Sequence, residues 1–320
     1  MVHVRPLRGF NKNEEGFLAS KCSIFSSRSN FAVLPEYICC MKALGYYNGK
    51  MGNPSRLTVS FNDRAVFFGD GVYDATYARN RKIYALDDHL ERFFDGLRAL
   101  DIHLSLTKED LKDLLCGLAK KTDGSECFVY WQASRGSALR DHAHQEDLNA
   151  NLYIFFKPSR LKDQTVKVDV IAVDDTRYAH CHVKTLNLLP NVLAYQRAVK
   201  EGAGEAVFHK NGRVTEGSQS NIFLLKNGAL VTPPADGLIL SGITRRKTIE
   251  ICENLGVPVG ERAFSWEELI EADEVFLTSV SRLGIGVCRA GGIPIGGKDG
   301  ELLKTIQNEL YIDFCSQTER

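Results

Sequence analysis

The 320-residue sequence lacks the features that mark several large classes of protein. Its 40 basic and 40 acidic residues balance, so no net charge favours nucleic acid or an anionic membrane as a partner. The apolar run Leu152–Phe156 is far too short to span a bilayer, and Met1–Ser23 has no apolar core of the signal-peptide type. Neither a G-x-x-x-x-G-K-[ST] loop nor a G-x-G-x-x-G turn is present, which disfavours nucleotide cofactors.

Metal-binding and disulfide patterns are also missing. The nine cysteines are odd in number and include no C-x-x-C pair, so we expect reduced thiols and a cytoplasmic protein. His142 and His144 lie close in sequence, but no further ligands cluster near them, so we expect no metal site.

The pattern along the chain predicts an α/β protein with two domains. Residues 1–43 show no regular periodicity and form an N-terminal extension to which we assign no role. Residues 44–157 alternate strand and helix patterns and are expected to form a smaller domain. The polar, proline-containing stretch 158–165 is typical of a linker, and residues 166–320 are expected to form a larger domain.

Local patterns predict several elements. Asn-Gly dipeptides at 48, 211 and 227 indicate hairpin turns. Residues 57–61 alternate like a strand. Residues 85–100 carry an apolar stripe at helical spacing, with Asp87 or Asp88 as the expected N-cap.

One lysine, Lys184, stands between a β-like run and a helix-like run. The run 166–173 upstream is β-rich, and residues 191–198 downstream open like a helix. Lys184 is therefore expected at the end of a strand, where its side chain can face a cleft.

Four other polar features of the sequence could act together with Lys184. The small-residue helix start 241–244 offers free N–H groups that suit a phosphate. Residues 278–279 end a strand with two hydroxyls, and Glu216 lies in a β-rich segment where a carboxylate needs a cationic partner. Arg92 lies off the apolar stripe of its helix and is a candidate counter-charge for a phosphate.

Pyridoxal phosphate is a cofactor that would use all five features. A lysine bonds covalently to its aldehyde, a carboxylate keeps its ring nitrogen protonated, and arginine and N–H groups hold its phosphate. The residues alone leave open the alternative of five unrelated polar groups.

Five motifs carry a family resemblance. The chain resembles the class IV (fold-type IV) pyridoxal-phosphate aminotransferases, most closely the D-amino-acid aminotransferases, over residues 45 to 315. In this order the motifs are highly specific; they are F-G-D-G-V-Y at 68–73, H-L-E-R at 89–92, K-T-L-N-L-L-P-N at 184–191, T-E-G-S at 215–218 and L-S-G-I-T-R at 240–245.

The resemblance implies a role for each motif. The fold would have two α/β domains with the cofactor in the cleft between them. Lys184 would bond to the cofactor and move the substrate's α-proton, and Glu216 would pair with the ring nitrogen. The other implied cofactor contacts are Arg92, Ser218, Leu240, Ile243, Thr244 and Ser279.

The resemblance also bears on the substrate. Arg140 and His142 match an R-x-H loop that, with the tyrosine corresponding to Tyr73, holds the substrate carboxylate in D-amino-acid aminotransferases. In that family the loop comes from the partner subunit, which implies a homodimer. Branched-chain aminotransferases and aminodeoxychorismate lyases share the cofactor motifs but typically lack this loop.

The implied reaction is ping-pong transamination between a D-amino acid, of the D-alanine or D-glutamate class, and pyruvate or 2-oxoglutarate. A branched-chain L-aminotransferase or a lyase is the nearest alternative, and a cofactor-binding protein without turnover is another. Two positions depart from the family pattern: Val280 replaces a usual threonine, and Gln219 replaces a smaller serine.

Overall fold

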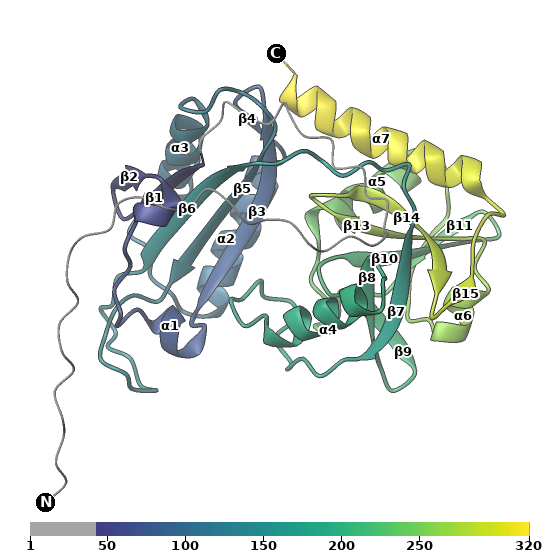
Figure 1. Ribbon diagram of the computed structural model, residues 1–320, viewed down its shortest axis with the longest axis horizontal. Coiled ribbons are helices and arrows are strands. Elements are labelled where there is room, and N and C mark those ends of the chain that lie inside the picture. Colours follow the sequence, from purple (N-terminus) through teal and green to yellow (C-terminus); the bar gives the residue numbers. More distant parts are fainter. Residues whose placement is uncertain (1–42, 320) are drawn as a thin grey trace, which may run out of the picture. The chain divides into compact units, whose positions relative to one another are not determined.

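The computed structural model describes residues 43–319 (Figure 1). The extension expected for residues 1–43 therefore lies, apart from its last residue, outside the described residues. The strands of the described chain form two β-sheets.

The first sheet is entirely antiparallel, with the strand order β2-β1-β6-β5-β3-β4. Asn48 and Gly49 have positive φ angles of 43° and 87° and close the β1–β2 hairpin, as predicted. Its strands are β1 (Leu44–Tyr47), β2 (Lys50–Gly52), β3 (Gly71–Arg79), β4 (Lys82–Ile83), β5 (Cys127–Ser134) and β6 (Asn151–Pro158).

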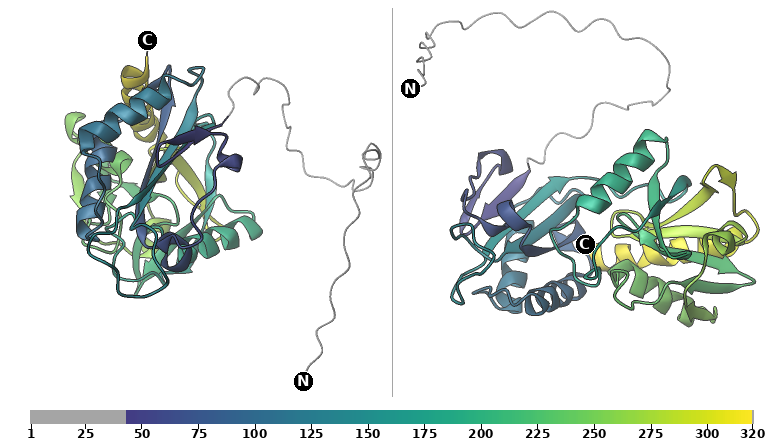
Figure 2. Two further views of the ribbon diagram at one scale, coloured as in Figure 1. Left: turned by 90° about the vertical axis from the view of Figure 1, so that its left-hand side faces the viewer. Right: turned by 90° about the horizontal axis from the view of Figure 1, so that it is seen from below.

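Helices α2 (Leu86–Ala99) and α3 (Lys108–Ala119) cover one face of this sheet (Figures 1 and 2). Phe93 of α2 packs against Trp131 of β5, with ring centroids 6.3 Å apart. The side chains at helical spacing in α2 and α3 and the inward side chains of the strands share one buried core. This packing fixes the start of β3, which carries Tyr73.

Two local predictions in this region are wrong. Residues 57–61 follow a short 3-10 helix, η1 (Pro54–Arg56), and form no strand, because in the structure they lie largely exposed with no neighbouring strand to pair with. Helix α2 begins after Ala85, which has a left-handed φ of 48° and gives no side-chain cap. Asp87 and Asp88 instead lie in the first turn, where their charges favour the helix dipole.

The second sheet is mixed, in the order β12-β11-β10-β13-β14-β7-β8-β9, with β15 on β14. The pairs β11–β12, β14–β7 and β7–β8 are parallel. Its strands are β7 (Val168–Asp174), β8 (Glu205–Lys210), β9 (Arg213–Gly217), β10 (Asn221–Lys226), β11 (Ala229–Thr232), β12 (Val259–Glu261), β13 (Glu274–Ser279), β14 (Leu283–Ala290) and β15 (Ile293–Pro294).

The second sheet curls around a core of its own. Val214 of β9 and Val231 of β11, from near opposite ends of the strand order, belong to the same buried cluster. Helices α5 (Ile243–Asn254) and α7 (Gly300–Thr318) pack on another apolar face, while α4 (Leu189–Lys200) packs on β7 and β8. The short helix α6 (Trp266–Ile270) adds Leu269 to the sheet's core.

The two sheets correspond to the two predicted halves of the chain. The last strand of the first sheet, β6, ends at Pro158, and the first strand of the second sheet, β7, begins at Val168. All the described residues belong to one compact unit, so the division at 158–165 stays a prediction. No helix among residues 43–319 combines the length and apolar character needed to cross a membrane.

Candidate active site

The backbone around Lys184 is attached to the start of β3. The Tyr73 N–H donates to the Lys184 carbonyl at 3.0 Å, and the Leu186 N–H donates to the Gly71 carbonyl at 3.1 Å. Val72 and Thr185 form an antiparallel bridge between these bonds. Because β7 ends at Asp174, Lys184 does not lie at the end of that strand as predicted. It lies in the following loop, which is fixed by a contact between distant parts of the chain.

The side chains of Lys184 and Tyr73 meet. The Lys184 Nζ donates to the Tyr73 hydroxyl at 3.1 Å and lies 4.3 Å from the centre of the Tyr73 ring. Tyr73 in turn stacks on Tyr130 of β5, with ring centroids 5.5 Å apart. A half-buried amine is thus held against an aromatic ring with a polar tip, which restricts where its nitrogen can lie.

Glu216 is a buried carboxylate near the end of β9. Its Oε2 accepts from the Leu240 N–H and from the Asn221 Nδ2, both at 3.1 Å, and its Oε1 accepts from the Arg177 Nη1 at 2.5 Å. Burial raises the pKa of Glu216 to about 7, and Arg177 only partly offsets this. The carboxylate therefore titrates near neutral pH in the protein alone.

Arg177 is a functional candidate that the sequence did not reveal. Its Nε and Nη2 donate to Asp175 at 2.9 Å and 2.7 Å, and its guanidinium lies 4.5 Å from the centre of the Phe208 ring. Held by Asp175 and Phe208, it presents Nη1 to Glu216. The need of Glu216 for a cationic partner was the available signal, but nothing in sequence spacing identified Arg177.

Arg92 is fixed by a second buried carboxylate. Its Nε and Nη2 donate to Asp74 at 2.9 Å and 2.7 Å, and Asp74 also contacts the His89 Nδ1 at 2.7 Å. Burial opposes ionisation of Asp74, but the neighbouring Arg92 and His89 outweigh it and hold the pKa of Asp74 well below its usual range. The remaining Arg92 Nη1 lies 3.4 Å from the carbonyl of Ser241, next to the start of α5.

The start of α5 offers unpaired donors at this point. Gly242 is the N-cap, and the N–H groups of Ile243 and Thr244 find no acceptor within residues 43–319. A Cβ on Gly242 would lie 2.1 Å from the Asn221 Oδ1, so only glycine fits there. Free N–H groups, the helix dipole and Arg92 together suit a dianion such as a phosphate.

Asn221 connects Glu216, the segment before α5 and the end of β13. Its Nδ2 donates to the Leu240 carbonyl at 2.9 Å as well as to Glu216, and in the sheet Asn221 pairs with Thr278. The end of β13 is thereby brought beside the start of α5. There the Ser279 and Ser281 hydroxyls lie 3.3 Å apart, so Ser281 supplies a second hydroxyl near the position where Val280 lacks one.

The hydrogen-bonding groups of Ser218 all have partners within the protein. Its hydroxyl donates to the buried Glu205, its N–H donates to the Ala206 carbonyl, and its own carbonyl accepts from Asn191. Its role as a cofactor contact stays a prediction. Leu240 is half-buried, and both of its backbone polar groups belong to the Glu216 and Asn221 network.

Arg140 and His142 do not join Lys184 within the single chain. Both side chains are exposed, and both lie against Phe68, with the Arg140 guanidinium carbon and the His142 ring centroid 5.1 Å and 5.3 Å from its ring centre. No hydrogen bond or ion pair in residues 43–319 links either of them to Lys184 or Tyr73.

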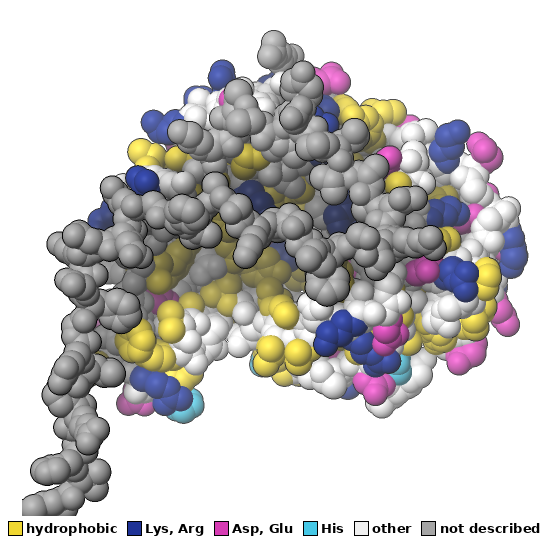
Figure 3. All heavy atoms as spheres, in the orientation of Figure 1, with side chains coloured by type: hydrophobic (Ala, Val, Ile, Leu, Met, Phe, Trp, Pro, Cys, Tyr) yellow, Lys and Arg dark blue, Asp and Glu magenta, His cyan; other side chains and the backbone are white. Residues whose placement is uncertain are grey.

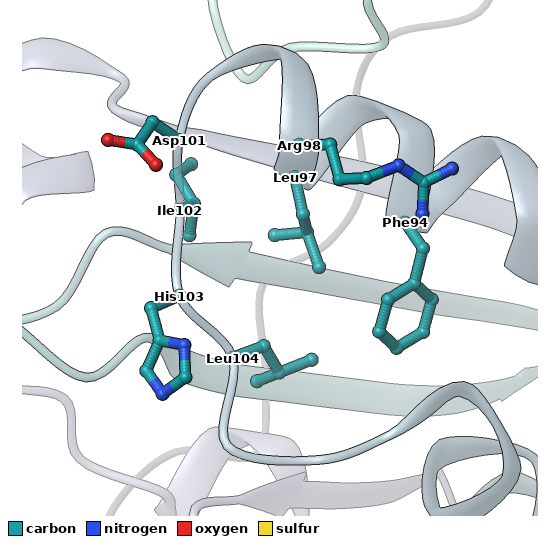
Figure 4. A pocket seen from close by; sticks show the side chains of 7 residues that line it. All are labelled: Phe94, Leu97, Arg98, Asp101, Ile102, His103 and Leu104. Atoms are coloured by element: carbon teal, nitrogen blue, oxygen red, sulfur yellow. The ribbon is translucent and has the colours of Figure 1, made fainter.

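A hollow of about 250 Å³ lies elsewhere, at the C-terminal end of α2 (Figure 4). Its lining mixes apolar and charged side chains and includes none of the predicted site residues. The lining residues are Phe94, Leu97, Arg98, Asp101, Ile102, His103 and Leu104.

Comparison with known proteins identifies the family. The profile of the family described as Amino-transferase class IV matches residues 71–290. The D-alanine aminotransferase of Bacillus licheniformis is 36% identical to this chain, over 88% of this chain and 99% of that protein. The chain therefore belongs to the class IV aminotransferase family.

Solved structures agree on the fold. The branched-chain aminotransferase of Thermoproteus uzoniensis with norvaline superposes with a TM-score of 0.79 at 23% identity, covering 86% of this chain and 96% of that one. The branched-chain amino acid aminotransferase of Escherichia coli also gives 0.79 at 23% identity, covering 87% and 96%. The mixed α/β fold implied by the resemblance is thus confirmed.

Proposed function

We propose that this enzyme transfers the amino group of a D-amino acid, of the D-alanine or D-glutamate class, to a 2-oxo acid such as pyruvate or 2-oxoglutarate. The observation that carries the proposal is the pairing of Lys184 with Tyr73 in a chain that also holds the buried Glu216. The R-x-H loop and the similarity to a D-alanine aminotransferase favour the D-amino acid over the branched-chain and lyase alternatives.

The site residues fit pyridoxal phosphate. Arg92 and the N–H groups of Ile243 and Thr244 would hold the phosphate, together with the Ser279 hydroxyl. Glu216 would face the ring nitrogen, and Leu240 would pack on the ring. Bound there, the cofactor supplies an electron sink for the bonds of the substrate's α-carbon.

The chain's own residues supply the proton transfer. Once released from the cofactor, the Lys184 amine can take the α-proton and return it, acting as general base and then general acid. The Tyr73 hydroxyl at 3.1 Å can hold this amine in position between the two transfers. Arg177 favours the ionised form of Glu216, which the burial of that carboxylate opposes.

The proposed working form is a homodimer. Arg140 and His142 are exposed and do not contact Lys184 in the single chain, so they are available to a second copy. Exposed apolar side chains gather over α1 (Arg64–Phe68) and the start of α4, on the face shown in Figure 3. They are Val66, Leu189, Val192 and Leu193. Phe61, which precedes α1 in the sequence, and Leu139, which precedes Arg140, are 80% and 82% exposed. Burial of such side chains favours association.

A cytoplasmic location belongs to the same proposal. Six cysteines of the described residues are free, and no disulfide forms among them. Unpaired thiols are typical of a reducing compartment.

A steady-state assay tests the proposed reaction. The purified protein with added pyridoxal phosphate is given D-alanine or L-alanine with 2-oxoglutarate, and pyruvate is measured. We expect turnover with D-alanine and little with L-alanine. In a parallel assay, L-leucine or L-valine replaces alanine and the glutamate formed from 2-oxoglutarate is measured; a preference for these donors would instead favour the branched-chain alternative. No transamination with any amino acid would favour the lyase or a binding protein.

A further inference from the structure

One turn, Phe68–Gly71, contacts both the Lys184 segment and the anchor of the R-x-H loop. Gly69 ends α1 in the left-handed conformation, with a φ of 61°. Its carbonyl accepts from the Asn187 Nδ2 at 3.0 Å, and the Gly71 carbonyl accepts from the Leu186 N–H at 3.1 Å. The backbone of the turn therefore holds the residues that directly follow Lys184.

The side chain of Asp70 holds two arginines. Its carboxylate accepts from the Arg64 Nε at 2.8 Å and from the Arg135 Nε at 2.9 Å. All three side chains are at most 13% exposed. Burial disfavours the Asp70 charge, but hydrogen bonds from Arg135 and Arg64 outweigh it and hold the pKa of Asp70 below its usual value. Asp70 is thus an ionised anchor at neutral pH.

Arg64 spans the distance from Asp70 to the R-x-H loop. Its Nη1 donates to the Asp141 carbonyl at 2.7 Å, and its Nη2 donates to the His142 carbonyl at 3.2 Å. A planar guanidinium makes these bonds in a fixed geometry, so the position of Asp70 sets the position of two successive loop carbonyls. Arg135 instead reaches the carbonyls of Leu100 and Asp101, beside the hollow in Figure 4.

This anchoring leaves the side chains of the loop available. Arg64 binds the loop through its backbone, and the ring of Phe68 supports Arg140 and His142 from one side. The Arg64 guanidinium carbon itself lies 4.9 Å from the centre of the Phe68 ring. Backbone anchoring on a rigid turn is what a loop needs if its two side chains are to meet a ligand in a defined geometry.

We propose that Asp70 is a positioning residue for substrate binding, acting through Arg64 to place the loop that carries Arg140 and His142. The inference rests on the proposed function, in which that loop holds the substrate carboxylate. It assigns to the Phe68–Gly71 turn a role that the family motif alone does not give: one turn sets both the Lys184 segment and the loop.

The first test uses Asp70→Asn, which keeps the size of the side chain and removes its charge. We expect the KM for D-alanine to rise about tenfold with kcat within about twofold, because the loop is misplaced while Lys184 is not. Arg64→Ala is expected to act in the same way, and Arg64→Lys to recover part of the loss, since an ammonium cannot span both partners. The dissociation constant for pyridoxal phosphate should stay within about twofold of wild type.

Arg262→Ala is the matched control. Arg262 also bonds a carboxylate and a backbone carbonyl, those of Glu268 and Ala263, but lies outside the Asp70 cluster. Its KM is expected to equal that of wild type. Thermal unfolding of each variant reports whether Asp70→Asn merely destabilises the fold. If it does, the KM of Arg64→Lys, which is the milder change, is compared with that of wild type instead.

A double-mutant cycle with Arg140→Ala separates the inference from the proposed function. If Asp70 acts through the loop, adding Asp70→Asn to Arg140→Ala should raise the KM by less than about twofold. Full additivity of the two effects would overturn the inference, as would unchanged KM values in both Asp70→Asn and Arg64→Ala. An Arg140→Ala variant with wild-type KM would instead overturn the proposed role of the loop itself.

Discussion

The Lys184 Nζ lies 3.1 Å from the Tyr73 hydroxyl and 4.3 Å from the centre of its ring, although 111 positions separate the two residues in the sequence. The backbone of Tyr73 also binds the backbone of Lys184, since the Tyr73 N–H donates to the Lys184 carbonyl. The contact between the two side chains therefore follows from the fold of the backbone. The amine proposed for catalysis and the hydroxyl proposed for substrate binding are therefore fixed relative to each other.

Replacement of Lys184 by alanine removes the amine that Tyr73 holds. We expect Lys184→Ala to lower kcat by about 10³-fold or more, since it removes both the proposed covalent bond to the cofactor and the proposed proton carrier. The absorbance of the bound cofactor near the edge of the visible range should also disappear. Lys108→Ala, on an exposed lysine paired with Glu91, is the control and should behave as wild type. Normal turnover by Lys184→Ala would refute the assignment.

Loss of the Tyr73 hydroxyl should have a smaller effect. Tyr73→Phe keeps the ring beside the amine but removes its hydrogen-bond partner, which typically contributes about 1 kcal/mol. We expect kcat/KM for D-alanine to fall by about three- to tenfold with cofactor binding retained. Tyr130→Phe, on the stacked neighbour whose hydroxyl donates to Gln132, serves for comparison. Equal effects in the two variants would argue against a specific role for the Tyr73 hydroxyl.

The titration of Glu216 predicts a pH dependence of cofactor binding. With a pKa raised to about 7, the ionised form is lost as the pH falls through that value. About nine-tenths of Glu216 is then ionised at pH 8 and about one-tenth at pH 6. Only the ionised form pairs with a protonated ring nitrogen, so the affinity of the apoprotein for pyridoxal phosphate should weaken towards pH 6.

Glu216→Gln provides the control for this pH dependence, because an amide does not titrate. The affinity of wild type divided by that of the variant removes the pH effects that the two proteins share, and this ratio should fall by roughly tenfold from pH 8 to pH 6. The variant should also lose most of its kcat at full cofactor occupancy. A ratio that is flat with pH would show that Glu216 does not titrate in this range.

Arg140 is expected to act on the substrate and not on the cofactor. A planar guanidinium binds a carboxylate with two charge-assisted hydrogen bonds, each contributing about 1.5–3 kcal/mol. Arg140→Ala should lower kcat/KM for D-alanine at least about tenfold and leave the spectrum of the resting cofactor unchanged. Arg140→Lys should recover only part of the activity. Arg160→Ala, on another exposed arginine, is the matched control. Wild-type kcat/KM in Arg140→Ala would place the carboxylate site elsewhere.

Local patterns in the sequence predicted much of the fold. The three Asn-Gly turns and the helix near residues 85–100 follow from short-range preferences, and the structure confirms them. The strand expected at residues 57–61 is wrong because alternation alone does not supply a partner strand. The N-cap position of Ala85 before α2 could not be predicted from local preferences either, because its left-handed backbone caps the helix without a hydrogen bond from a side chain.

The candidate site was only half visible in the sequence. Lys184, Glu216 and Arg92 stand in recognisable motifs, but the residues that hold them do not. Arg177 reaches Glu216 across 39 positions and Asp74 reaches Arg92 across 18, and such pairings become evident only once the strands are in register. Asp70 stands in the F-G-D-G-V-Y motif, but its contacts with two arginines become evident only in the fold.

A single half-reaction tests the central claim most directly. The purified protein loaded with pyridoxal phosphate is mixed with D-alanine and, separately, with L-alanine, without any 2-oxo acid, and its absorbance near the edge of the visible range is followed. We predict that D-alanine abolishes this absorbance and releases about one equivalent of pyruvate per site, while L-alanine does so far more slowly. An equal or faster response to L-alanine, or none to either enantiomer, would contradict the proposed D-amino-acid transamination.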